Sequence, residues 1–318
     1  MAGNPSDAIG GAAVAVPVPM LSATVELHDA DRLVLRPLHD DGWSSVDELV
    51  AHTDRYGHEG AGRLVSAAIV SLVRWCRERS VDIDPAPFEV RWSTAAPRSV
   101  GLGGSSAIVI ATLRSLCRRW RLDVDAPQLA AVALHAEVGE LGVAAGWMDR
   151  AVQALDAPTF VDTRGDGEVP EMRVLTADPQ LELLVAWDPA GAAPSGRLHA
   201  GLRERSAARE PTVLAAVGRL VDAALVAADA LERGDRDELA RAVDQTCDAR
   251  DRLGALDAAT RRMVGVASAA SAAATSAGSG GAVLVVPPVD ATQHVEQRLR
   301  AAGAGVVRLQ PGRGRSAP

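Results

Sequence analysis

A glycine-rich run directly before an apolar helical pattern is the strongest structural constraint in this chain. The segment Pro97–Ala107 reads PRSVGLGGSSA, and IVIATLRSLCRRW follows it. Glycines permit tight turns and the close approach of a ligand. The helix predicted from about Ser105 to Trp120 begins with unpaired N–H groups and the positive end of its dipole, which suits an anion. An ordinary glycine turn with a serine cap remains the alternative interpretation from local chemistry.

The composition limits how the chain can bind such an anion. It also limits the classes of partner that the chain can have. All 33 basic residues are arginine, so a P-loop lysine is absent. The net charge of −8 and the 3% aromatic content argue against a nucleic-acid partner. Apolar stretches stay far below the ~20 residues of a membrane span. The three cysteines form no C-x-x-C pair, and we expect a soluble, cytoplasmic protein with no membrane partner.

Hydrophobic patterns predict both strands and helices, and therefore an α+β fold. Strand patterns cover residues 12–36, 87–93, 181–187 and 282–286. Helical patterns cover residues 60–79, 105–120, 126–141, 211–233 and 236–253. The segment 163–171 is rich in glycine and charge, which indicates a domain junction. We expect an N-terminal domain over 1–165, a C-terminal domain over 166–312 and a tail over 313–318.

Three motifs in chain order resemble those of the GHMP kinases, the superfamily of galactokinase, homoserine kinase and mevalonate kinase. The run Pro97–Ala107 is similar to the phosphate-binding motif, Gly3–Asp7 (GNPSD) to the N-terminal substrate-side motif, and Ala277–Ala282 (AGSGGA) to the C-terminal glycine loop. Within the superfamily the chain most resembles the glucuronokinases, nearly end to end, including the stretch Ala136–Arg150.

This resemblance implies an architecture and an activity. The fold implied has two lobes, an N-terminal ribosomal-S5-like lobe and a C-terminal ferredoxin-like lobe, with ATP between them. The reaction implied is Mg²⁺-dependent transfer of the ATP γ-phosphate to the anomeric hydroxyl of D-glucuronate, which gives D-glucuronate 1-phosphate. The substrates are small molecules, and we expect a monomer or a homodimer. The alternatives are a kinase for another sugar, such as a heptose, and a catalytically silent nucleotide- or sugar-binding homologue.

The resemblance also assigns roles to single residues. Asp149 matches the catalytic aspartate, and Ser106 and Glu137 match the Mg²⁺ ligands, which are the hard oxygen donors that this ion prefers. From residue type alone, Asp149 is also a typical helix cap and Glu137 a typical solvated helix carboxylate. Residues expected to bind the nucleotide are Pro97, Gly101, Leu102, Gly103, Gly104, Ser105, Ser106, Ala107, Gly278, Ser279, Gly280 and Gly281.

Candidate sugar ligands are less specific. Asn4 and Asp7 belong to the substrate-side motif, and a guanidinium group binds a carboxylate in a two-pronged fashion. The arginines considered for this role are Arg150, Arg197, Arg203 and Arg250.

The chain departs from the family pattern in three places. The residue pair Val138-Gly139 makes the segment after Glu137 one residue longer than in glucuronokinase-like sequences. Either Glu137 keeps the metal and the helix end absorbs the extra residue, or Glu140 replaces it; we favour Glu137. Thr275 stands where the family often has a basic residue, and we expect the family's first strand upstream of Met1.

Overall fold

The computed structural model describes residues 1–36, 42–190 and 196–312, with side chains from residue 201 onward in the last range. The expected tail at 313–318 lies outside the described residues. Contacts group the chain into two compact units. Unit 1 comprises Met1–Met20, Pro97–Gly103 and the chain from Gly146 onward, and unit 2 comprises Leu21–Ala96 and Gly104–Ala145. The domain division near residue 165 stays a prediction.

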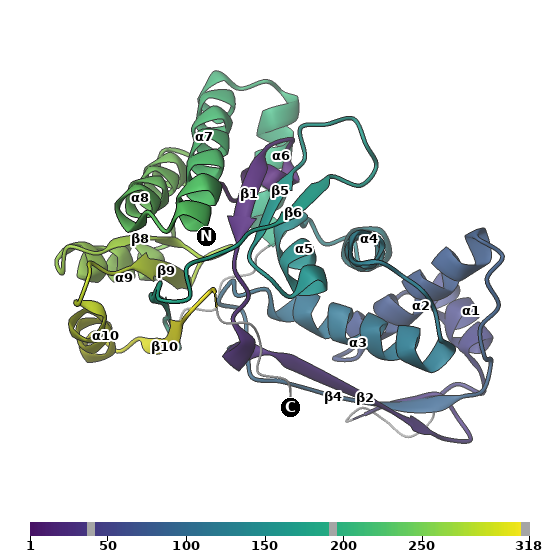
Figure 1. The fold of residues 1–318 in the computed structure, drawn as a ribbon. Coiled ribbons are helices and arrows are strands. Elements are labelled where there is room, and N and C mark those ends of the chain that lie inside the picture. The colour runs from purple at the N-terminus through teal and green to yellow at the C-terminus, as the bar shows by residue number, and fades with distance from the viewer. Residues whose placement is uncertain (37–41, 191–195, 313–318) are drawn as a thin grey trace. The chain divides into compact units, whose positions relative to one another are not determined.

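Unit 2 is a small sheet covered by helices (Figure 1). Its sheet has the order β2-β4-β3, with β2 antiparallel and β3 parallel to β4. Helix α3 packs on this sheet, and Ser115 Oγ donates to Val25 O at 3.0 Å. The elements are β2 (Ala23–Asp29), β3 (Val34–Arg36), α1 (Val46–Tyr56), α2 (Arg63–Glu78), β4 (Phe88–Thr94), α3 (Gly104–Trp120), α4 (Ala126–His135) and the π turn η3 (Ala136–Glu140).

Unit 1 holds two antiparallel sheets. The first has the order β1-β5-β6, and the segment 163–171, expected as a domain junction, connects the paired strands β5 and β6 and includes the first residue of β6. The second has the order β10-β7-β9-β8, which is the fourth, first, third and second strand of a split β-α-β-β-α-β arrangement. The strands are β1 (Ala12–Ala15), β5 (Thr159–Asp162), β6 (Glu171–Val174), β7 (Leu183–Trp187), β8 (Ala273–Ser276), β9 (Ala282–Val286) and β10 (Gly305–Leu309).

The helices of unit 1 cover both faces of the four-stranded sheet. Side chains alternate along β7, so Leu183 and Leu184 enter different clusters. Leu183 packs in the cluster that includes α7 and α8, and Leu184 in the cluster that includes α9 and α10. Figure 1 shows α7 and α8 side by side. The helices are α5 (Met148–Leu155), α6 (Gly196–Ala207), α7 (Pro211–Arg233), α8 (Arg236–Arg252), α9 (Ala258–Ser268) and α10 (Thr292–Ala301).

The expected α+β fold is confirmed, with a core built almost entirely from Ala, Val and Leu. Short 3₁₀ turns at Ser6–Ala8 and Pro19–Leu21 complete the described elements. Across the described ranges no helix is both long enough and apolar enough to cross a membrane.

We predict that Leu184→Ala destabilises the protein by about 2–5 kcal/mol, because a fully buried side chain leaves a cavity in a packed sheet face. Val174→Ala on β6 is the matched control, since that side chain is 50% exposed and its truncation costs at most ~0.5 kcal/mol. Urea unfolding measures both. Equal effects would contradict the assignment of the core.

Candidate functional site

Two glycine-rich segments meet within unit 1. Gly101 has a φ of +72°, and a Cβ atom added to it would lie 2.8 Å from both Ser279 N and Gly280 O. A Cβ atom added to Gly278 would overlap Gly101 O. Only glycine lets the two backbones approach this closely. The structure therefore brings together the glycine-rich run Pro97–Ala107 and the late glycine loop Ala277–Ala282. The sequence connected these two motifs only through the family resemblance.

Asp149 lies beside the first of these segments, in the first turn of α5. Gln153, one turn later, donates from Nε2 to Gly103 O at 2.9 Å. A Cβ atom added to Gly103 would lie 3.3 Å from Asp149 Cγ. The Asp149 side chain is 34% exposed, which leaves its carboxylate open to a ligand. Trp147, not Asp149, occupies the N-cap position of α5, so the helix-cap interpretation is wrong.

Asp7 supplies the acceptor at the start of α5. Its buried Oδ2 accepts a hydrogen bond from Met148 N at 2.9 Å, which satisfies one of the N–H groups that every helix start leaves unpaired. A Cβ atom added to Gly146 would overlap this oxygen, so the approach requires glycine. Asp7 thus positions the helix that carries Asp149, and a contact of Asp7 with sugar stays a prediction.

Asn4 carries a buried polar atom without a protein partner. Its Nδ2 donates to Ala277 O at 3.2 Å, in the late glycine loop. Its Oδ1 is buried and accepts no hydrogen bond from the described residues, and the same holds for the hydroxyls of Thr275 and Ser279. Leaving such an atom unsatisfied costs about 1–3 kcal/mol. Unsatisfied acceptors gathered on two motifs are typical of a site completed by a ligand.

Arg250 connects the N-terminal motif to the late glycine loop. Its side chain is fully buried, and it donates to Asn4 O at 3.2 Å, Gly278 O at 2.7 Å and Ala255 O at 3.4 Å. Burial lowers the pKa of Arg250 to about 10, so the group is charged at neutral pH. Because its donors serve main-chain carbonyls, we assign Arg250 to holding the two motifs and leave it out of the sugar ligands proposed below.

The glycine-rich run continues into unit 2, where α3 begins at Gly104. Ser106 in the first turn of α3 and Glu137 in the π turn are 1% and 2% exposed. The interpretation of Glu137 as a solvated carboxylate is therefore wrong. Among the residues that the structure describes, no three His, Cys, Asp or Glu side chains form a metal cluster. A hydroxyl and one carboxylate fit Mg²⁺, which keeps waters and shares phosphate oxygens with its nucleotide.

The remaining candidate arginines differ in what the structure shows of them. Arg150 is largely buried, donates from Nη1 to a main-chain carbonyl at 3.1 Å and lies 3.8 Å from Asp149 Oδ2. Arg203 donates to the carbonyl of Ala8, the residue after the N-terminal motif, at 3.4 Å. Arg197 lies in α6, and its side chain is outside the described residues.

Sequence reasoning missed three residues that support the site. Gln153 follows the aspartate by four residues and so shares its helix face, a signal that the sequence carried. Thr246 of α8 accepts from Gly3 N at 3.2 Å, and Thr260 of α9 accepts from Gly281 N at 3.2 Å. No local pattern distinguishes these threonines from other helix residues.

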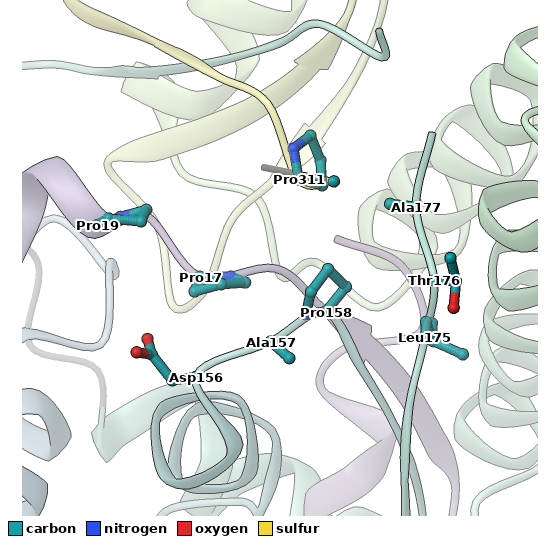
Figure 2. Close-up of a pocket in the computed structure, with 10 residues that line it drawn as sticks. Pro17, Pro19, Asp156, Ala157, Pro158, Leu175, Thr176, Ala177 and Pro311 are labelled. Carbon is teal, nitrogen blue, oxygen red and sulfur yellow. The ribbon is translucent and has the colours of Figure 1, made fainter. Parts of the chain in front are cut away.

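A separate pocket of about 220 Å³ lies in unit 1 (Figure 2). Its labelled residues come from the segment after β1, the turn after α5, the stretch after β6 and the chain end after β10. None of the residues predicted to bind nucleotide, metal or sugar lines it. The lining residues are Pro17, Pro19, Asp156, Ala157, Pro158, Leu175, Thr176, Ala177, Pro311 and Gly312.

Comparison with known proteins yields a family, a relative and a fold. The family model of the GHMP kinases N terminal domain matches residues 64–156. Glucuronokinase 1 of Arabidopsis thaliana is 30% identical over 318 residues, which cover 95% of this chain and 86% of that protein.

Solved structures extend the likeness in fold. Phosphomevalonate kinase of Streptococcus pneumoniae, in complex with phosphomevalonate and AMPPNP, superposes with a TM-score of 0.75 at 15% identity, covering 96% of this chain and 95% of the other. A D-glycero-D-manno-heptose 1-phosphate kinase from Bacteroides thetaiotaomicron gives a TM-score of 0.69 at 17% identity, covering 96% and 91%.

We predict that Gly278→Ala costs about 1–3 kcal/mol, because the new methyl group overlaps main-chain atoms of Gly101. For a chain of this size the melting temperature falls by several degrees, at about 2–4 °C per kcal/mol. Gly104→Ala is the control, since its Cβ atom meets only Ala96 Cβ at 3.5 Å at the start of a helix that favours alanine. A melting temperature of Gly278→Ala equal to that of Gly104→Ala would refute the close backbone contact.

Proposed function

Because this chain belongs to the GHMP kinase family and is an ATP-dependent sugar kinase, we propose that it phosphorylates the anomeric hydroxyl of a sugar acid, D-glucuronate, in the cytoplasm. The observation that carries this proposal is the position of the Asp149 carboxylate against Gly103 in the glycine-rich run. A proton acceptor beside a phosphate-binding backbone is the arrangement that phosphoryl transfer to a hydroxyl requires.

The glycine-rich run offers the transferring phosphate its main-chain donors. The first N–H groups of α3 have no partner inside the helix, and they lie at the positive end of the helix dipole. Gly101 and Gly103 have positive φ angles and no side chains, so a phosphate group can approach the backbone. Donors fixed before the reaction stabilise the charge of the transition state without reorganising.

Asp149 is the proposed base. Its carboxylate takes the proton of the anomeric hydroxyl as that oxygen forms a bond to the γ-phosphorus. The bond from the γ-phosphorus to the β,γ-bridging oxygen breaks, and ADP leaves with the electron pair. Asp7 and Gln153 keep the base in place, because one fixes the start of α5 and the other ties α5 to Gly103.

Ser106 and Glu137 are the residues proposed to hold Mg²⁺. Their buried hydroxyl and carboxylate supply hard oxygen donors, and each lies on a helical element of unit 2. When bound, the ion neutralises charge on the phosphates of ATP. The sugar carboxylate is assigned to Arg150, whose side chain lies next to Asp149. Asn4, with its unsatisfied Oδ1, is proposed to accept from a sugar hydroxyl.

An ADP-release screen across sugars and sugar acids, with Mg²⁺ and ATP, tests the proposal. We expect D-glucuronate to give the highest kcat/KM and EDTA to abolish turnover. A heptose as the best substrate would replace the sugar acid and keep the kinase. ATP binding without turnover on any sugar would favour the catalytically silent homologue and overturn the proposal.

We predict that Asp149→Asn lowers kcat by ~10²–10⁴, the usual contribution of a general base, while the Kd for ATP stays near that of the wild type. The substitution keeps the shape and removes the proton acceptor. Steady-state kinetics and nucleotide titration measure the two effects.

The control for this prediction is Asp156→Asn, in the turn after the same helix. It removes the same charge from a residue that we give no role in catalysis, so its kcat is expected to match that of the wild type. A folded Asp149→Asn protein with normal turnover would eliminate the proposed base.

We predict that D-glucuronate exceeds D-glucose in kcat/KM by at least ~10²-fold, because only the sugar acid offers a carboxylate for charge-assisted hydrogen bonds with a largely buried guanidinium. Arg150→Gln is expected to narrow this ratio. Arg173→Gln, which removes an exposed arginine paired with Glu232 on the protein surface, should leave it unchanged. Arg150→Gln with the wild-type ratio would remove Arg150 from the carboxylate site.

A further inference from the structure

The π turn that carries Glu137 forms the C-terminal end of a regular helix. α4 runs through His135 and continues without a break into η3, over Ala136–Glu140. Such turns are rare, hold one more residue than an α turn and often occur at functional sites. A turn of this kind can accommodate the extra residue that we expect after Glu137 from the sequence. Its end is closed by Val143 N, which donates to Glu137 O at 2.8 Å.

Basic side chains of neighbouring elements surround the last residue of the π turn. The Glu140 carboxylate is only 5% exposed. Its Oε2 accepts from His58 Nε2 at 3.3 Å, and its Oε1 pairs with Arg74 Nη1 at 3.0 Å. His135 Nδ1 lies 3.8 Å from Oε1. Oε2 thus has a hydrogen-bond partner, whereas the buried Oε1 faces the charge of Arg74 and accepts no hydrogen bond from the described residues.

These contacts fix the turn against the helix that packs on it. His58 precedes α2 and its Nδ1 lies 2.9 Å from Ser66 Oγ, while Arg74 lies on α2 itself. Helix α2 packs against both α4 and η3. A buried carboxylate costs several kcal/mol unless it is paired, so the arrangement favours one position of Glu140.

The charge of Glu140 persists under the conditions of the reaction. Burial by itself would raise the pKa of this carboxyl group, but the hydrogen bond from His58 and the charge of Arg74 outweigh it and hold the pKa below its ordinary value. Glu140 is ionised at neutral pH, and it serves as a permanent anchor.

We infer that Glu140 is a positioning residue for the metal site: with His58 and Arg74 it fixes the π turn, and the turn sets the direction of the Glu137 carboxylate. The inference rests on the proposed function, in which Glu137 holds Mg²⁺. A wider turn rotates less per residue than an α turn, so relaxation to α geometry would turn Glu137 relative to the anchored Glu140. Because Glu140 is held by His58 and Arg74, Glu137 is the carboxylate that is left to bind Mg²⁺.

The test compares Glu140→Gln and Arg74→Gln with the wild type in the full-length protein. We expect the half-saturating Mg²⁺ concentration to rise ~10-fold or more, the usual effect of losing a group that orients a metal ligand. Excess Mg²⁺ is expected to restore kcat to nearly the wild-type value. Arg74 is partly exposed, so Arg74→Gln keeps the test usable if Glu140→Gln fails to fold.

Two measurements do not depend on turnover. Mn²⁺ titration followed by EPR, in the presence of ADP, is expected to show a weaker Kd in both variants, and hydrogen exchange of residues 136–143 is expected to be faster. Glu89→Gln is the control, because that carboxylate also pairs with two arginines of unit 2, Arg36 and Arg91, but lies on β4. It is expected to leave both measurements unchanged.

The outcomes separate this inference from the proposed function. Folded variants with wild-type Mg²⁺ dependence and Mn²⁺ affinity would overturn the positioning role while the kinase assignment stands. Loss of Mn²⁺ binding in Glu140→Gln as complete as in Glu137→Gln would make Glu140 a ligand and also overturn it. A wild-type protein that binds Mn²⁺ with ADP but phosphorylates no sugar would instead contradict the proposed function.

Discussion

The contact between two backbones at Gly101 and Gly278 is the constraint on which the candidate site depends. No side chain fits between these segments, so the phosphate-binding run and the late glycine loop exist in this arrangement only as glycine. Around this contact the glycines present main-chain atoms rather than side chains. A chain without lysine needs main-chain N–H donors, because it has no ammonium group to offer a phosphate.

Buried polar groups hold the rest of the site to that contact. Arg250 joins the N-terminal motif to the late glycine loop through the carbonyls of Asn4 and Gly278, and Asp7 fixes the start of the helix that presents Asp149. In unit 2, Glu140 has the corresponding role for Glu137. In each case we assign to a buried charged group the role of positioning a neighbouring motif or reactive group.

The regular elements with strong periodicity were predictable from the sequence. Residues 211–233 and 282–286 form the expected helix and strand because their apolar spacing matches their burial. Helix α1 was missed although its buried residues Val46, Leu49, Val50 and Thr53 have helical spacing and Ser45 caps its start, so the sequence carried this signal. Strand β6 was not predicted, and only its first residue, Glu171, fell in the expected junction, because the strand is mostly exposed and carries no apolar alternation. The π turn depends on contacts with α2, which no local pattern contains.

The site residues also differ in how far the sequence alone could identify them. The glycine-rich run could be predicted to bind an anion from its residue types and the helix that follows it. Asp149 and Glu137 were found through the family resemblance. The structure brings Asp149 to Gly103 and buries Glu137, but their roles in the reaction stay predictions. Arg250 could not be distinguished from a surface arginine by sequence, because its burial results from segments far apart in the chain.

The central claim is that this site transfers phosphate to the anomeric oxygen of a sugar acid. ³¹P NMR of the product formed from D-glucuronate, ATP and Mg²⁺ tests it most directly. The account predicts one phosphate signal coupled to the anomeric proton, together with loss of the reducing end. A phosphate on any other hydroxyl, with the reducing end intact, would contradict it.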